Sequence, residues 1–118
     1  MQLTTKNIGI PKKGQVLTNK SKAKFKMSLE RSLENGFCFK DLQKREVKAF
    51  NSFIDKTVGK NLTVLEVNQR FGRSPDKSDS IDGYNIYHYE VSGKFRIHGY
   101  LKEGYFVICR IDPNHRVH

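Results

Sequence analysis

Apolar and polar residues alternate along three segments in the C-terminal half of the chain, and this alternation predicts strands. Ser92-Gly93 and Glu103-Gly104 separate the segments as two-residue turns, because glycine allows the positive φ that tight hairpins require. We therefore expect an antiparallel meander that closes the chain. Its strands would span 84–91, 94–101 and 105–111.

Apolar residues recur at helical spacing before these strands. Asp41 can cap a first helix that ends at Gly59. Thr63 and Glu66 match a capping box at the start of a second helix, which ends at Phe71. The first helix has one apolar stripe, which we expect to pack on the core. The stripe contains Leu42, Val47, Ala49, Phe50, Phe53, Ile54 and Val58.

Two shorter elements are predicted closer to the N-terminus. Phe25, Leu29 and Leu33 recur every four residues, which favours a short helix over 21–34. The apolar run over 37–39 then favours a short strand.

The order of these elements is β-α-α-β-β-β, which indicates an α+β fold. A chain of 118 residues accommodates one such domain. We expect this domain over 37–118, preceded by a partly irregular, lysine-rich extension over 1–36.

The net charge of +10 is concentrated in two places. Residues 1–29 carry seven lysines, among them Lys12 and Lys13, and no acidic residue. Such a run is typical of a solvated tail, or of a segment that binds nucleic acid in a salt-sensitive way. The rest of the excess charge lies in 94–118, where arginine and histidine are interleaved with aromatic residues.

The cellular compartment is inferred from absences in the sequence. No apolar run approaches the roughly 20 residues of a membrane span, and no signal peptide is visible at the N-terminus. Cys38 and Cys109 lie in apolar runs and are interpreted as buried free thiols. We expect a cytoplasmic protein that binds no membrane.

The two-residue turns predict the register of the meander. Lys94 would pair with Val91, and His98 would lie between Tyr87 and Cys109. One face would then form the core and would include Glu90 and Arg110, although a bulge would move residues to the other face. The opposite face would carry Tyr87, Tyr89, Arg96, His98, Tyr100 and Cys109.

Arginine, histidine and tyrosine on one face can hold a phosphodiester and move protons near neutral pH. Arg96 would neutralise the charge that develops on phosphorus. Two of the three residues His98, His115 and His118 would serve as general base and general acid. Glu90 is a second candidate base, although the predicted register points it towards the core. The residues expected to bind RNA are Tyr87, Tyr89, Lys94, Tyr100, Arg110, Arg116, Lys12 and Lys13.

Each candidate also has a structural interpretation. His98 could be an ordinary half-buried histidine, and Arg96 could form a surface ion pair with Glu90 or Asp112, worth about 0–1 kcal/mol. The tyrosines are good strand formers, and a terminal His118 is often frayed. No metal site is expected, because no cysteine or paired carboxylate stands near the C-terminal histidines.

The predicted layout resembles the RelE/ParE toxin superfamily of bacterial toxin–antitoxin systems, over residues 37–118. The resemblance implies a RelE-like, microbial-RNase-type fold, in which a small antiparallel sheet with a terminal β-meander packs against two or three helices. It depends on Phe37-Cys38-Phe39 before the helices, on Gly93-Lys94-Phe95-Arg96-Ile97, and on His115-Arg116-Val117-His118 at the end.

The resemblance further implies an endoribonuclease that cuts mRNA on the ribosome without a metal or small-molecule cofactor, and that is held by a cognate antitoxin. Arg96 would match the arginine that stabilises the phosphorane, and His115 with Arg116 would match the basic cluster near the end. His118 stands where many members have tyrosine. The alternative is a non-catalytic module of the same fold that binds RNA or the ribosome, or that blocks a protein such as gyrase.

Overall fold

The computed structural model describes residues 22–74 and 78–117, which form an α+β fold with one five-stranded sheet. No helix in these two ranges is long and apolar enough to cross a membrane. The helices are α2 (Lys44–Thr57) and α3 (Val64–Phe71), and the sheet strands are β1 (Met27–Ser28), β2 (Gly72–Arg73), β5 (Tyr87–Ser92), β6 (Phe95–Lys102) and β7 (Tyr105–Asp112). A small separate hairpin contains β3 (Ser80–Ile81) and β4 (Tyr84–Asn85).

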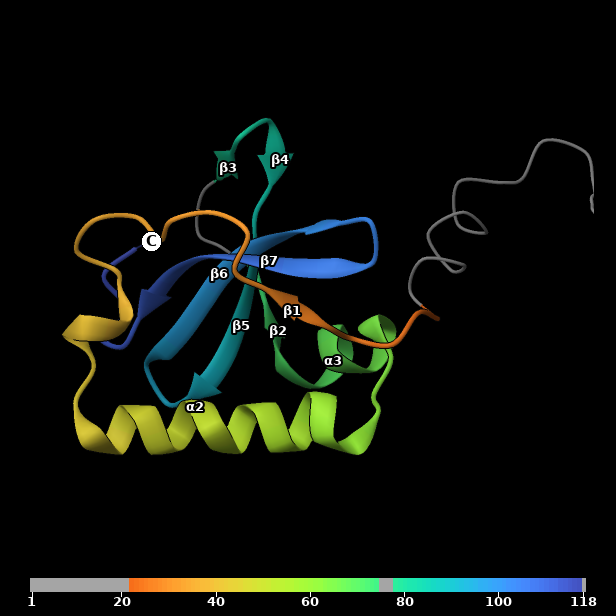
Figure 1. Cartoon of the computed structure of the whole chain (residues 1–118), viewed down its shortest axis with the longest axis horizontal. Helices are drawn as coiled ribbons and strands as arrows, with labels where there is room; N and C mark the ends of the chain where they lie inside the picture. The colour runs from red at the N-terminus through yellow and green to blue at the C-terminus, as the bar shows by residue number, and fades with distance from the viewer. Residues whose placement is uncertain (1–21, 75–77, 118) are drawn as a thin grey trace, which may run out of the picture.

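The strand order of the sheet is β1-β7-β6-β5-β2 (Figure 1). The predicted meander is confirmed, since β5, β6 and β7 are antiparallel neighbours. The short strand β1 extends the sheet by pairing in parallel with β7. Helices α2 and α3 lie together on one side of the sheet, and the β3–β4 hairpin projects from the sheet at the end away from α2 (Figure 1).

The core lies between the sheet and the helices and is built largely of aromatic rings. Phe53 of α2 and Tyr89 of β5 each contact Phe25 edge-on, and Phe25 also stacks on Phe106 of β7. Each of these four residues is at most 2% exposed. Burial of such a side chain stabilises the fold by about 1.5–3 kcal/mol.

The start of α3 confirms the predicted capping box. Thr63 Oγ1 accepts from the backbone N–H of Glu66 at 3.2 Å, and Glu66 Oε1 accepts from the N–H of Thr63 at 2.9 Å. The predicted cap of α2 is wrong, because the carboxylate of Asp41 accepts from Cys38 in a preceding 3-10 turn, Phe39–Asp41. Gln43 takes that place, and its N–H donates to Glu46 at 2.7 Å.

The two elements predicted before α2 are wrong. The range 21–34 holds no helix in its described part, where β1 and extended chain occur instead, and Phe25 contributes to the core. Pairing with β7 supplies long-range hydrogen bonds that four-residue periodicity cannot reveal. No strand forms over 37–39, and the first strand is β1. Part of the predicted 1–36 extension therefore packs into the same core as the rest of the domain.

Two β-bulges change the predicted register. Between β6 and β7 the pairs run as predicted from Lys102–Tyr105 to Gly99–Ile108, after which Cys109 is extra and His98 pairs with Arg110. The predicted turn at Ser92-Gly93 and the predicted Lys94–Val91 pair are wrong, because Ser92 pairs with Phe95 across a Gly93-Lys94 turn. In β5 the extra residue is then Val91, so that Glu90 pairs with Arg96 and His88 pairs with His98.

Each bulge moves every residue beyond it to the other face. The core-side placement of Glu90 and Arg110 is therefore wrong, because both share a face with their partners Arg96 and His98. The placement of Tyr89 beside Arg96 is wrong as well, because Tyr89 pairs with Ile97 in the core. Tyr87 likewise pairs with Gly99 instead of His98.

Candidate functional site

The sheet face opposite the helices carries two adjacent rows of titratable side chains, each running across neighbouring strands. The first row crosses four strands, because each of its members pairs with the next. The second row crosses three strands in the same way. Together they bring seven ionisable groups to one surface. The rows are Arg73–His88–His98–Arg110 and Glu90–Arg96–Asp112.

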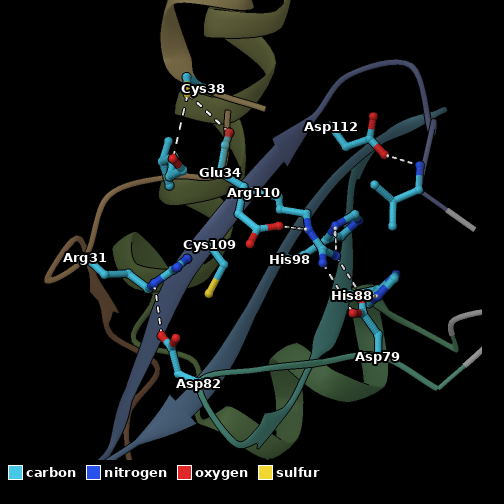
Figure 2. Close-up of polar contacts among 12 residues, drawn as sticks. Arg31, Glu34, Cys38, Asp79, Asp82, His88, His98, Cys109, Arg110 and Asp112 are labelled. Atoms are coloured by element: carbon cyan, nitrogen blue, oxygen red, sulfur yellow. Dashed lines mark hydrogen bonds and ion pairs between the residues drawn. The ribbon is translucent and has the colours of Figure 1, made fainter. Parts of the chain in front are cut away.

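The middle of the first row is buried. The rings of His88 and His98 stack with their centroids 4.1 Å apart, and they are 4% and 0% exposed. Arg110 continues the row, with Nη1 lying 3.4 Å from Nδ1 of His98 (Figure 2). Asp79, which precedes β3, approaches Nε2 of His88 at 3.6 Å.

Arg110 is held by two carboxylates from outside the meander. Its Nη1 and Nη2 donate to the two oxygens of Asp79 at 2.6 and 3.2 Å, and its Nε donates to Glu34 at 2.8 Å (Figure 2). Burial acts to lower the pKa of Arg110, but the hydrogen bonds that it donates to Asp79 and Glu34 outweigh this effect and raise that pKa. Arg110 is therefore a permanent charge beneath the histidine pair.

Part of this face is covered by residues 29–38, here called the strap, which follow the outer edge of β7. The N–H of Glu34 donates to Cys109 at 2.9 Å, and the N–H of Ile111 donates to the strap residue Phe37 at 2.8 Å. Arg31 of the strap forms an ion pair with Asp82 of the β3–β4 hairpin at 3.0 Å (Figure 2). The apolar end of the face is closed by the hairpin itself, whose residue Ile81 packs in a small second core cluster.

Glu90 of the second row is more exposed than the histidine pair, and it contacts one arginine from each row. Oε1 of Glu90 lies 2.9 Å from Nε of Arg73 and 3.6 Å from Nη2 of Arg96. The side chains of Arg73, Glu90 and Arg96 are 44%, 31% and 13% exposed, so solvent reaches this group. We call Arg73, Glu90 and Arg96 the charged triad. Arg96 also donates to the backbone carbonyl of Gly93.

Beyond Arg96, the second row ends at a buried carboxylate. Asp112 is 0% exposed and accepts from the backbone N–H groups of Arg116 and Val117 at 3.0 and 2.9 Å. These bonds turn the C-terminal segment back towards the sheet. His115 lies in this turn at φ 54° and is exposed.

A pocket of about 360 Å³ opens beside the charged triad, at the edge of the sheet where β2 ends. His88 and Arg73 reach this pocket from the first row, and Asn68 reaches it from α3. The full lining is Asn68, Gly72, Arg73, Ser74, Ile86, Tyr87 and His88.

The structure brings together only part of the predicted site. Arg96 and His98 share the face as predicted, and Arg110 joins them, but His98 is completely buried. Tyr100 also lies on this face, where the ring of Tyr84 stacks on it at a centroid distance of 4.2 Å. The hydroxyl of Tyr100 donates to Asp82, and burial, followed by that carboxylate, raises the Tyr100 pKa.

Other predicted site residues lie away from the two rows. Tyr89 belongs to the core, whereas Tyr87 is 38% exposed at the pocket. Lys94 lies in a different pocket of about 410 Å³, next to Arg45 of α2. Arg116 covers the ring of Phe37 at 4.5 Å and donates to the carbonyl of Gly36. Lys12, Lys13 and His118 lie outside the described residues.

Four residues of this region were missed or misplaced by sequence reasoning. Arg73 and Asp79 fall in a polar segment that gives no periodic signal, and His88 belongs to a strand whose register a bulge changes. Glu90 is misplaced for the same reason. Within the described ranges, no three His, Cys, Asp or Glu side chains are arranged to hold a metal ion.

Comparisons of the chain with protein-family models, with curated proteins and with solved structures gave no match.

Proposed function

We propose that the protein is a metal-independent endoribonuclease, the toxin of a toxin–antitoxin pair with a RelE-like fold. The observation that supports this proposal is the charged triad, in which one carboxylate stands between two guanidinium groups beside a pocket. Transesterification of RNA needs a base for the 2′-OH, positive charge for the phosphorane and an acid for the leaving oxygen.

In this proposal Glu90 is the general base. It contacts both arginines, which are also the groups that would bind a phosphate. An incoming phosphodiester competes for the guanidinium groups of Arg73 and Arg96 and releases the carboxylate to accept the 2′-OH proton. The 2′-oxygen then attacks phosphorus, and the two arginines stabilise the charge of the pentavalent state.

His88 is the general acid in this scheme. It lies two residues from Glu90 on the same face of β5, a separation of roughly 7 Å that leaves room for a phosphate between them. It donates its proton to the 5′-oxygen as the P–O bond breaks, which yields a 2′,3′-cyclic phosphate and a 5′-hydroxyl end. His98 and Arg110 act as positioning residues, since they pack behind the His88 ring.

These roles revise the assignment made from sequence. Arg96 keeps its role as the phosphorane-stabilising arginine. His98 becomes a positioning residue because it is 0% exposed, whereas His88, which is also buried, lines the pocket. Glu90 moves from the core to the centre of the site.

The proposed partners are mRNA on the ribosome and an antitoxin protein. An apolar groove of about 400 Å³ between α2 and the β1–β7 edge suits the antitoxin. Leu29 is 61% exposed there, and Lys26 is the charged residue of the lining, so an amphipathic helix with acidic residues would complement the groove. Its other lining residues are Met27, Phe39, Phe50, Ile54, Val58, Tyr105 and Ile108.

The proposal is tested by inducible expression in bacteria, in which growth is followed and transcript 5′ ends are mapped. We expect arrest and new 5′ ends for the wild-type protein, and loss of both for Glu90→Gln and for Arg96→Ala. Glu103→Gln and Arg70→Ala are matched controls, because both side chains are exposed and Arg70 pairs with Glu66 and not with a residue of the triad.

Two results would count against the enzyme. If Glu90→Gln produced the same new 5′ ends as the wild type, Glu90 would not be the general base. Growth arrest by the wild type without any new ends would favour the non-catalytic alternative, a module that blocks a protein target. Full-length protein cleaving a short RNA in vitro separates direct cleavage from effects of expression.

A further inference from the structure

The pocket beside the charged triad has the lining of a nucleobase site. It offers the ring of Tyr87, which is 38% exposed, and the aliphatic side chain of Ile86. Aromatic rings stack on single-stranded bases, while polar groups at the edge select among them. The polar group on the α3 side of the pocket is the amide of Asn68.

The orientation of the Asn68 amide is set by the core. The Tyr89 hydroxyl donates to Oδ1 of Asn68. Burial raises the pKa of Tyr89, so this hydroxyl stays protonated and remains a donor. The carbonyl end of the amide is thereby used, and within the described residues Nδ2 of Asn68 has no hydrogen-bond partner. The bond from Tyr89 fixes which end of the amide faces the core, and the two hydrogens of Nδ2 can be donated to a ligand.

The location of the pocket fits the chemistry proposed above. Arg73 lines the pocket and also binds Glu90 at 2.9 Å, so it connects the base site with the reacting phosphate. His88, the proposed acid, lies on the same wall. One nucleotide could therefore place its phosphate at the triad and its base in the pocket.

We propose that this pocket binds one RNA base and selects keto bases, guanine and uracil, through the Nδ2 donor of Asn68. The inference rests on the proposed ribonuclease function and adds its substrate preference. Guanine O6 and uracil O4 accept a hydrogen bond where adenine and cytosine present an amino group, which is itself a donor. A second donor facing the amide would leave both groups without a partner.

The test measures binding of the four nucleoside 3′-monophosphates to the full-length protein by calorimetry. For the wild type we expect the guanosine and uridine nucleotides to bind about five- to tenfold more tightly than the other two. Asn68→Asp keeps an acceptor for the Tyr89 hydroxyl and replaces the donor by a carboxylate oxygen. Its preference should therefore reverse towards adenosine and cytidine nucleotides.

Gln69→Glu is the matched control, because Gln69 is the exposed neighbour on α3 and receives the same change of charge. It should keep the wild-type order of affinities. Thermal unfolding of Asn68→Asp confirms that the variant is folded before its affinities are compared.

RNA cleavage by the same proteins separates the base pocket from the nuclease. Equal affinities for all four nucleotides, or an unchanged order in Asn68→Asp, would overturn the base pocket even where Glu90→Gln abolishes cleavage. If Asn68→Asp reverses the order while Glu90→Gln cleaves like the wild type, the pocket binds nucleotides and the proposed ribonuclease chemistry is wrong.

Discussion

Replacement of Arg110 by methionine tests how the buried side of the site is held together. Methionine has a similar length but no charge, so it leaves Asp79 and Glu34 without the guanidinium that they share. Removal of one partner from a buried ion pair costs about 3–5 kcal/mol, because the remaining charge has no compensation. We expect Arg110→Met to lower the free energy of unfolding by this amount.

The two carboxylates should contribute unequally. The Asp79 side chain is 10% exposed and receives two bonds from Arg110, whereas the Glu34 side chain is 38% exposed and receives one. Exposed pairs contribute about 0–1 kcal/mol, so Glu34→Gln should cost no more than that. Arg110→Lys should recover only part of the loss, because an ammonium group cannot reproduce the two-pronged contact with Asp79.

Urea denaturation at pH 7 measures these differences. Arg70→Met is the control, since the Arg70 side chain is 59% exposed and lies 3.9 Å from Glu66, and it should change stability by about 0.5 kcal/mol or less. A loss below about 1 kcal/mol for Arg110→Met would refute the reasoning. It would mean that solvent or rearrangement compensates the carboxylates that the structure shows as buried.

Three further predictions concern single positions. Thr63→Ala removes the acceptor of the α3 capping box and should cost about 1 kcal/mol in urea denaturation, with Thr63→Ser close to the wild type. Gly99→Ala should greatly reduce the thermal stability, since its Cβ would overlap the backbone carbonyl oxygen of Val107. Burial raises the pKa of Tyr89 above its ordinary value of 10.0 and the pKa of the Cys109 thiol above 9.0. The folded protein therefore keeps both groups protonated more strongly than the unfolded chain does, and its free energy of unfolding should fall as pH rises above these ordinary values. Denaturation between pH 8 and 11 should show this loss, and Tyr89→Phe should reduce it.

Elements with strong local signals were predicted well. The capping box and the Glu103-Gly104 turn depend on interactions within a few residues, and both are present where the sequence placed them. The first turn lies one residue later than predicted, at Gly93-Lys94. The strand at Met27 has no such signal, because its partner residues Phe106 and Val107 lie about 80 residues away in the sequence. Four-residue spacing in that segment therefore indicated a helix, although Phe25 packs into the core from extended chain.

The sheet face that carries the candidate residues was predicted only in part. Arginine and histidine of β6 were correctly assigned to one face, because alternation within a strand does not depend on its neighbours. Which residues of β5 and β7 join them depends on bulges, and neither Val91 nor Cys109 differs in sequence pattern from an ordinary strand residue. Asp79 reaches the face from irregular chain and Arg73 from the two-residue strand β2, and both segments are too short or irregular to show a period.

The two bulges together determine what this sheet face can do. Without the bulge at Val91, the Ser92–Phe95 pairing would continue, so that Arg96 would face Val91 and Glu90 would pair with Ile97 in the core. Without the bulge at Cys109, Arg110 would be on the helix side, and the histidine pair would lose its charged neighbour. The bulges replace an alternating apolar pattern by a face on which carboxylate, guanidinium and imidazole groups are adjacent. Since bulges recur beside active sites, where they redirect a side chain, this pair supports the assignment of Glu90 and Arg96 to chemistry over a purely structural ion pair.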